Sequence, residues 1–173
     1  MILITVGTEQ FPFDRLMGWF DALQDSDLLG EEMVVQYGTC TLLPAGARVY
    51  RVLREADFFS LIEQARVVVA HCGEGTLLQL DAMETPFILV PRSAHYREHV
   101  DDHQVELAKA LASLGVPVGW SPGDLVRFLA EPHKISISDI SIAAAGVACR
   151  RLTERFPPET KLFEKGRTAD QTR

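Results

Sequence analysis

Cysteine is scarce in this chain of 173 residues, which contains only Cys40, Cys72 and Cys149. The three thiols lie far apart in the sequence, so no two of them have the short spacing that zinc-binding cysteines show. An odd and sparse set also does not make a disulfide framework. We therefore expect a chain that works in a reducing compartment.

Excess positive charge and long apolar runs are missing as well. The net charge is −7, so we expect no bulk attraction to nucleic acid or to anionic lipid. No run approaches the roughly 18 apolar residues of a membrane-spanning helix. The first ten residues, MILITVGTEQ, lack the basic region and long apolar stretch of a signal peptide. These absences predict a cytosolic, soluble chain, and they leave open a membrane-bound partner.

The chain also lacks the dinucleotide fingerprint G-x-G-x-x-G after its first apolar run, where the sequence is GTEQFP. This argues against a dehydrogenase. Gly7 and Thr8 nevertheless occupy the position, directly after a first strand, where doubly wound folds bring a ligand close to the backbone. An ordinary tight turn explains the same two residues equally well.

What the chain does contain is an alternation of apolar strands and amphipathic helices. Strands are expected over 1–6, 33–37, 49–52, 67–70, 87–90 and 117–120. Helices are expected over 12–23, 57–64, 101–114, 121–129 and 138–156, with one more directly after the turn at 71–76. This order predicts an α/β fold, in which one open parallel sheet has helices on both faces. We expect one domain over 1–156 and a flexible tail over 157–173.

The chemistry is concentrated between the strand at 67–70 and the strand at 87–90. The first of these strands runs into His71-Cys72-Gly73-Glu74-Gly75-Thr76, and a helix follows at once. Glycines let the backbone approach a phosphate, and the positive end of the helix attracts it. The turn between two very apolar elements therefore predicts a diphosphate site, specifically one for a nucleotide sugar.

Two patterns could instead indicate a metal. The segment from His95 to His99 matches the H-x-x-E-H pattern of some zinc peptidases, and His95, His99 and His103 recur every four residues. The first pattern needs a helix but follows a strand and a proline, and the second is interrupted where Asp101-Asp102 predicts a helix start. We expect no metal. Cys72 beside His71 is also not expected to form a nucleophile and base, because adjacent residues at a strand end point apart.

Three segments of the chain resemble the donor-binding, C-terminal domain of family 28 glycosyltransferases. They are ILITVGTEQFPFDRL, HCGEGTLLQLDAMETPFILVPR and EHVDDHQVELAKAL. The resemblance is to the small single-domain branch, which holds PssE-type subunits of exopolysaccharide synthesis. That branch is related to MurG and to the catalytic subunit of the eukaryotic dolichol-linked second-GlcNAc transferase.

The resemblance implies a Rossmann-like fold, the C-terminal half of a GT-B glycosyltransferase, with a UDP-sugar as ligand and no cofactor. It also implies the donor-binding residues, which are Gly7, Thr8, His71, Gly73, Glu74, Gly75, Thr76, Gln79, Arg92, Asp102, His103 and Gln104. Gln79 stands where MurG-like enzymes have a glutamate for the ribose hydroxyls, so its hydrogen bond lacks the assistance of a charge.

The function implied is that of the donor-binding, catalytic subunit of a split enzyme. Such an enzyme moves a sugar, with inversion, from a UDP-sugar to a polyprenyl-diphosphate-linked acceptor in exopolysaccharide or capsule synthesis. A membrane-associated PssD-type subunit would hold the acceptor and the general base, and it would keep this chain at the inner face of the membrane. The candidate bases on this chain are His71 and His103. The alternative is a non-catalytic enhancer of a partner transferase.

Overall fold

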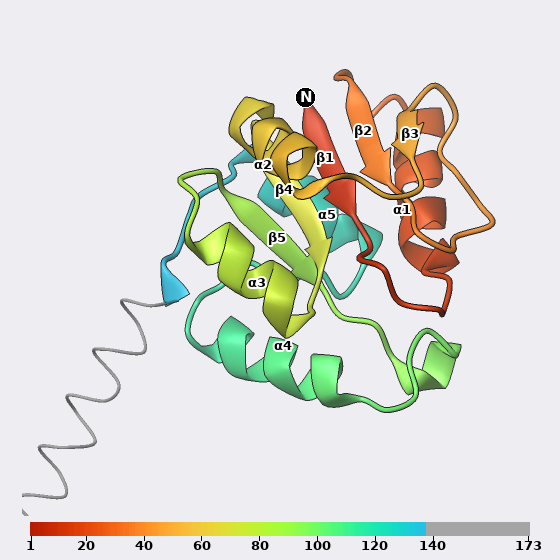
Figure 1. Cartoon of the computed structure of the whole chain (residues 1–173). Coiled ribbons are helices and arrows are strands. Elements are labelled where there is room, and N and C mark those ends of the chain that lie inside the picture. Colours follow the sequence, from red (N-terminus) through yellow and green to blue (C-terminus); the bar gives the residue numbers. More distant parts are fainter. Residues whose placement is uncertain (138–173) are drawn as a thin grey trace, which may run out of the picture. The chain divides into compact units, whose positions relative to one another are not determined.

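The computed structural model describes residues 1–137, and the expected helix over 138–156 and the expected tail lie outside them. A parallel sheet of five strands forms the centre, in the order β3-β2-β1-β4-β5 (Figure 1). The strands are β1 (Ile2–Thr5), β2 (Met33–Gln36), β3 (Arg48–Tyr50), β4 (Val67–His71) and β5 (Phe87–Val90).

Helices cover both faces of this sheet, which confirms the predicted architecture. They are α1 (Asp14–Asp25), α2 (Glu55–Gln64), α3 (Glu74–Asp81), α4 (His103–Ser113) and α5 (Pro122–Ala130), with a short 3-10 helix, η1 (Ala94–Tyr96). In Figure 1, α2 and α3 lie in front of the sheet, and α1 and α5 lie behind it. The rear layer shares one apolar core with alternate residues of the strands, to which α1 contributes Phe20 and α5 contributes Leu125.

The burial of the central strands explains why their continuous apolar runs predicted them from the sequence. Every residue of β1, β2, β4 and β5 is buried, because each of these strands has helices over both of its faces. The register places Ile4 of β1 between Val35 of β2 and Val69 of β4. Only β3, at the edge of the sheet, exposes all its residues.

The strand expected over 117–120 is reduced to a single bridge between Val118 and Leu89 of β5. The Leu89 N–H donates to the Pro117 carbonyl, and the Gly119 N–H donates to the Leu89 carbonyl. Ser121 then caps α5 by accepting from the Asp124 N–H, and Pro122 occupies the first turn. The helix therefore begins before a longer strand can form.

Candidate functional site

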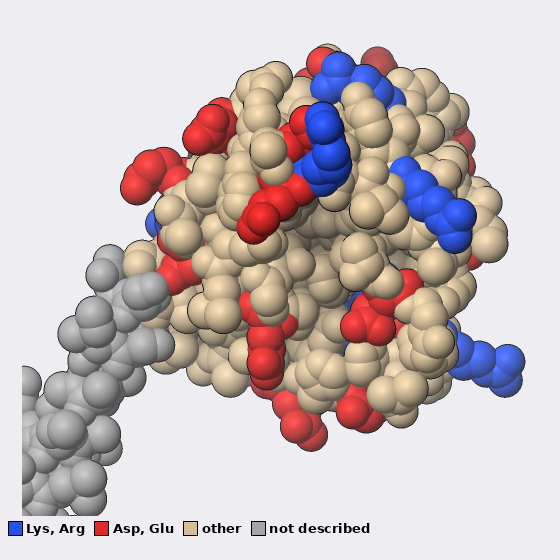
Figure 2. All heavy atoms as spheres, viewed as in Figure 1, with Lys and Arg blue, Asp and Glu red and all other residues tan. Residues whose placement is uncertain are grey.

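A cavity of about 620 Å³ opens at the carboxyl ends of the central strands. Figure 2 shows this face of the molecule hollowed where the cavity lies. Its walls come from the loop after β1, the end of β2, the segment leading into α2, the turn between β4 and α3, and the start of α4. Among the lining residues within 1–137, the acidic side chains are Glu9, Glu55 and Glu74, and none is a lysine or an arginine.

All but two of the donor-binding residues predicted from the sequence line this cavity. They are Gly7, Thr8, His71, Gly73, Glu74, Gly75, Thr76, Gln79, His103 and Gln104. Residues that the sequence did not single out also contribute, among them Thr5, Gln36, Phe58 and His99. The two that the structure places outside the lining are Arg92 and Asp102.

Arg92 is fully buried and serves the fold. Its Nη1 donates to the Phe11 carbonyl at 2.7 Å, and its Nη2 donates to the Val6 carbonyl at 2.6 Å. The guanidinium also lies over the ring of Phe13, 4.8 Å from the centroid. Burial lowers the pKa of this guanidinium. Arg92 thus ties the segment after β5 to the loop after β1, and its side chain has no route into the cavity.

Asp102 stands at the N-cap position of α4 and faces the preceding loop. Its Oδ1 accepts hydrogen bonds of 2.9 Å from the Ser93 hydroxyl and from the Ala94 N–H. The pKa of this carboxyl is lowered, mainly by the Ala94 backbone bond and next by the Ser93 hydroxyl. The residue therefore shapes the loop before α4 and does not reach the cavity.

The imidazole of His71 fills the space between two glycines from different loops. Gly7 has a φ of +72°, and a Cβ there would lie 2.5 Å from Cε1 of His71. A Cβ on Gly73 would lie 2.4 Å from Nε2. Both positions therefore require glycine while the ring stays in place.

His71 is also almost completely withdrawn from water, with an exposed fraction of 6%. Its Nδ1 is buried without a hydrogen-bond partner. Burial, and secondarily the nearby Arg92 guanidinium, lowers its pKa to about 4. The ring is therefore neutral at physiological pH.

Gln36 holds the Gly7 loop in this position. Its Oε1 accepts from the Thr5 hydroxyl at 2.7 Å and from the Gly7 N–H at 3.2 Å. Its Nε2 donates to the carbonyls of Gly7 and Arg51 at 3.0 and 3.1 Å. The Gln36 side chain thus bonds both the backbone N–H and the backbone carbonyl of Gly7. The signal in the sequence was a polar residue at the end of the apolar run MVVQ.

The start of α3 presents unoccupied backbone donors to the cavity. Gly73 is the N-cap residue, and no side chain caps the helix. The first intrahelical bond runs from the Leu77 N–H to the Gly73 carbonyl, so the N–H groups of the preceding turn lack helical partners. Because Glu74, Gly75 and Thr76 line the cavity, this end of the helix is oriented to receive an anion.

The H-x-x-E-H segment is not arranged as a zinc site. His95 lies in η1, while Glu98 is buried with an exposed fraction of 3%. Both carboxylate oxygens of Glu98 accept from Arg15, at 2.9 Å from Nε and 2.9 Å from Nη2. This bidentate pair occupies the carboxylate that a metallopeptidase would need as a base.

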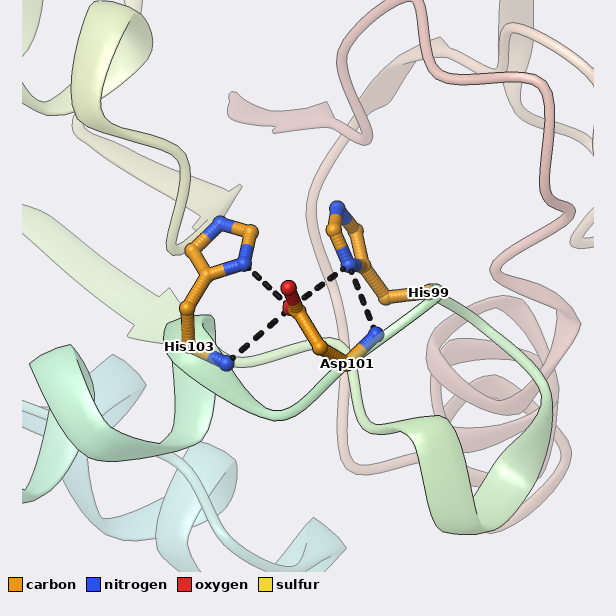
Figure 3. Close-up of side chains that lie close together, drawn as sticks. All are labelled: His99, Asp101 and His103. Atoms are coloured by element: carbon orange, nitrogen blue, oxygen red, sulfur yellow. Dashed lines mark hydrogen bonds and ion pairs between the residues drawn. The ribbon is translucent and has the colours of Figure 1, made fainter.

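The four-residue histidine stripe is also interrupted, as the sequence predicts, because α4 begins only at His103. His99 and His103 instead meet through Asp101, which lies between them (Figure 3). The Asp101 pKa is lowered, chiefly by the hydrogen bond from the His103 side chain. Both imidazoles line the cavity, and Asp101 does not.

Comparison with known proteins defines the class of this domain. The sequence model of the glycosyltransferase family 28 C-terminal domain matches residues 1–131. The chain therefore belongs to the family of glycosyltransferase family 28 C-terminal domains.

A curated relative is the UDP-N-acetylglucosamine--N-acetylmuramyl-(pentapeptide) pyrophosphoryl-undecaprenol N-acetylglucosamine transferase of Gloeothece citriformis. The two sequences are 34% identical over 71 residues, which are 41% of this chain and 19% of the relative. The match thus spans about a fifth of the length of that enzyme.

Two solved structures are similar to this chain at lower sequence identity. The glycosyltransferase SnogD from Streptomyces nogalater matches with a TM-score of 0.49 and 21% identity, over 70% of this chain and 31% of that one. The glycotransferase of kitacinnamycin matches with a TM-score of 0.46 and 19% identity, over 90% of this chain and 40% of that one.

None of the helices within residues 1–137 has the length and apolar character of a membrane-spanning segment.

Proposed function

We propose that this chain is the donor-binding subunit of a split glycosyltransferase, which moves a sugar from a UDP-sugar to a lipid-linked acceptor in exopolysaccharide or capsule synthesis. Membership of family 28 supports the transferase class. The observation that carries the donor site is the uncapped start of α3, which opens into a cavity at the carboxyl edge of the sheet.

In this proposal the diphosphate of the donor lies at the start of α3. No lysine or arginine of the described part of the chain lines the cavity, so within that part the backbone N–H groups and the helix dipole stabilise the charge. The Thr76 hydroxyl is in the first turn and can add a hydrogen bond. In the proposal Gln79, one turn further along α3, bonds the ribose hydroxyls and His103 contacts the sugar. Gln104 is buried and its Oε1 accepts from the Arg92 N–H, so it supports the loop beneath the sugar.

The reaction would be a single displacement with inversion. An acceptor hydroxyl attacks the anomeric carbon, the bond from that carbon to the UDP oxygen breaks, and UDP leaves with the electron pair. A base removes the hydroxyl proton. Negative charge grows on the departing diphosphate, where the start of α3 stabilises it without a change of geometry.

The general base is best supplied by a partner. His71 is deeply buried, and with a pKa of about 4 it would hold a proton only weakly. His103 is half exposed at the start of α4, and its contact with Asp101 involves Nδ1, so its Nε2 is the candidate base on this chain if the partner supplies none. A membrane-associated PssD-type subunit would bring both the base and the polyprenyl-diphosphate-linked acceptor, and would hold this cytoplasmic chain at the inner face of the membrane.

The alternative is an enhancer that binds a partner transferase without taking the donor. Titration of the purified chain with UDP, by calorimetry or NMR, separates the two functions. Donor binding predicts a weak response, with the chemical-shift changes concentrated in residues that line the cavity, including Gly73 and Gly75. Absence of any response, both for the chain alone and for its complex with the partner, would remove the donor-site proposal.

A further inference from the structure

Asp101 brings two imidazoles to one carboxylate oxygen. Its Oδ1 lies 3.1 Å from Nδ1 of His99, makes a close contact with Nδ1 of His103, and accepts from the His103 N–H at 3.2 Å. The two rings meet edge to face, with centroids 4.5 Å apart. Figure 3 shows both Nδ1 atoms directed at the carboxylate, one from the loop before α4 and one from its first residue.

The protons on these nitrogens cannot satisfy every contact. The bond from His99 to the Asp101 carboxylate needs a proton on Nδ1. The Asp101 N–H, however, lies 3.3 Å from the same Nδ1 and needs a lone pair there. A cation among the three side chains removes the need for a proton on either Nδ1, because it uses the lone pairs of both nitrogens and the charge of the carboxylate. The Asp101 N–H then turns to water, which is available because Asp101 is exposed.

We infer that His99, Asp101 and His103 form a binding site for a divalent transition-metal ion of the Zn²⁺ type. One ligand atom from each residue lies within 4.8 Å of the other two. Bond lengths of about 2.0–2.2 Å place tetrahedral ligands on the order of 3.4 Å apart, so small side-chain rotations suffice. Two imidazoles favour Zn²⁺ over Mg²⁺ or Ca²⁺, which take oxygen ligands.

This site differs from the two patterns visible in the sequence. It uses neither His95 nor Glu98, and it requires an aspartate from a position that the sequence indicated only as a helix start. The expectation of a chain without metal rested on those two patterns. The loop from His99 to His103 folds its two histidines together instead of spacing them along a helix.

The position of the ion has a consequence for the proposed donor, and this step rests on the proposed function. Both imidazoles line a cavity whose charged lining residues are glutamates. An ion held by two neutral rings and one carboxylate adds net positive charge to that wall. Zn²⁺ should therefore raise the affinity for a diphosphate, and the diphosphate should raise the affinity for Zn²⁺ by the same factor.

The site itself is tested with the full chain and with metal alone. Zn²⁺ calorimetry and Co²⁺ absorption should show one site that weakens by at least about tenfold in Asp101→Asn, His99→Ala and His103→Ala. His95→Ala and His133→Ala are matched controls and should bind normally. Circular dichroism verifies that each variant is folded. Equal binding in folded Asp101→Asn, or loss of binding in the controls, overturns the inference.

The coupling is tested by measuring UDP affinity with and without Zn²⁺. We expect a gain of about fivefold or more in the natural chain, and none in Asp101→Asn. If UDP fails to bind under all conditions, the donor site is wrong while the metal titration still stands. If UDP binds equally with and without bound Zn²⁺, the placement of the ion in the cavity wall is wrong.

Discussion

The ring of His71 leaves no space for a side chain on Gly73, because a Cβ there would lie 2.4 Å from Nε2. Gly75, two residues further on, is different: a Cβ there would meet nothing within 4 Å. One turn therefore contains a glycine that the fold requires and a glycine that the fold does not require. Substitutions at these two positions therefore test folding and ligand binding separately.

Gly75→Val should fold normally and lose its ligand. A branched side chain would stand between the diphosphate and the N–H groups of the first turn of α3, which we expect to weaken transition-state stabilisation by about 2–4 kcal/mol. Turnover by the assembled enzyme and UDP titration measure the loss, while the melting temperature should hold or rise. Full turnover in the folded variant would place the diphosphate elsewhere.

Gly73→Ala is the matched comparison in the same turn. The added Cβ must displace the buried imidazole, which should cost about 1–3 kcal/mol of unfolding free energy. Denaturant unfolding measures this cost. A Gly73→Ala chain as stable as the natural one would mean that His71 has room to move.

The neutral state of His71 makes stability depend on pH. The unfolded chain protonates this ring near pH 6.5, while the folded chain resists protonation down to a pKa of about 4. The unfolded state therefore binds more protons in this window. The His71 contribution falls by up to about 3 kcal/mol as the pH drops from 6.5 to 4, and is constant above that window. NMR titration of the ring checks it, and a midpoint above pH 6 would contradict the buried, neutral state.

Gln36→Leu should release the Gly7 loop. The substitution removes four hydrogen bonds and leaves the Thr5 hydroxyl and the Gly7 peptide without partners, each at a cost of about 1–3 kcal/mol. We expect lower stability and weaker UDP binding together. Gln64→Leu, on the exposed face of α2, is the control and should change neither. Unaltered UDP binding in Gln36→Leu would show that the loop holds its shape without the amide.

The purified chain should transfer no sugar by itself. His71 is too buried and too acidic to act as a base, and the acceptor is expected on a partner. Co-expression with a membrane-associated partner, followed by a screen of UDP-sugars, should restore transfer. Robust transfer by the isolated chain to a lipid-linked or simple acceptor would refute the split enzyme, and His103→Ala would then be the first variant to test.

The helices, the strands and the glycine-containing turn before α3 were predictable because their signals are local. The run at 67–70 is apolar throughout, since strands buried on both faces have no alternation of polar residues, and glycines mark the turn that follows. The position of the cavity was also predictable, because the carboxyl ends of parallel strands all lie at one edge of the sheet.

The partners of individual polar residues were not predictable in this way. Gln36 is hydrogen-bonded to the backbone of Gly7, 29 positions away, and Arg92 to the carbonyl of Val6, 86 positions away. The resemblance to family 28 glycosyltransferases placed Arg92 among the donor contacts. Whether such a side chain points into the cavity or back into the core depends on packing, which no local pattern records. The loop that joins His99 to His103 was missed for the same reason.

A single ring that separates two loops also restricts how this domain can evolve. Neither Gly7 nor Gly73 can acquire a side chain while the imidazole at position 71 remains, because each Cβ would collide with it. For Gly73 the order of changes is therefore set: a smaller residue must first replace His71, and only then can position 73 diversify. Gly7 stays restricted even then, because its φ of +72° is a conformation that favours glycine. Homologues that retain the histidine should keep both glycines, and those that have lost it should vary at position 73 while they keep the glycine at position 7.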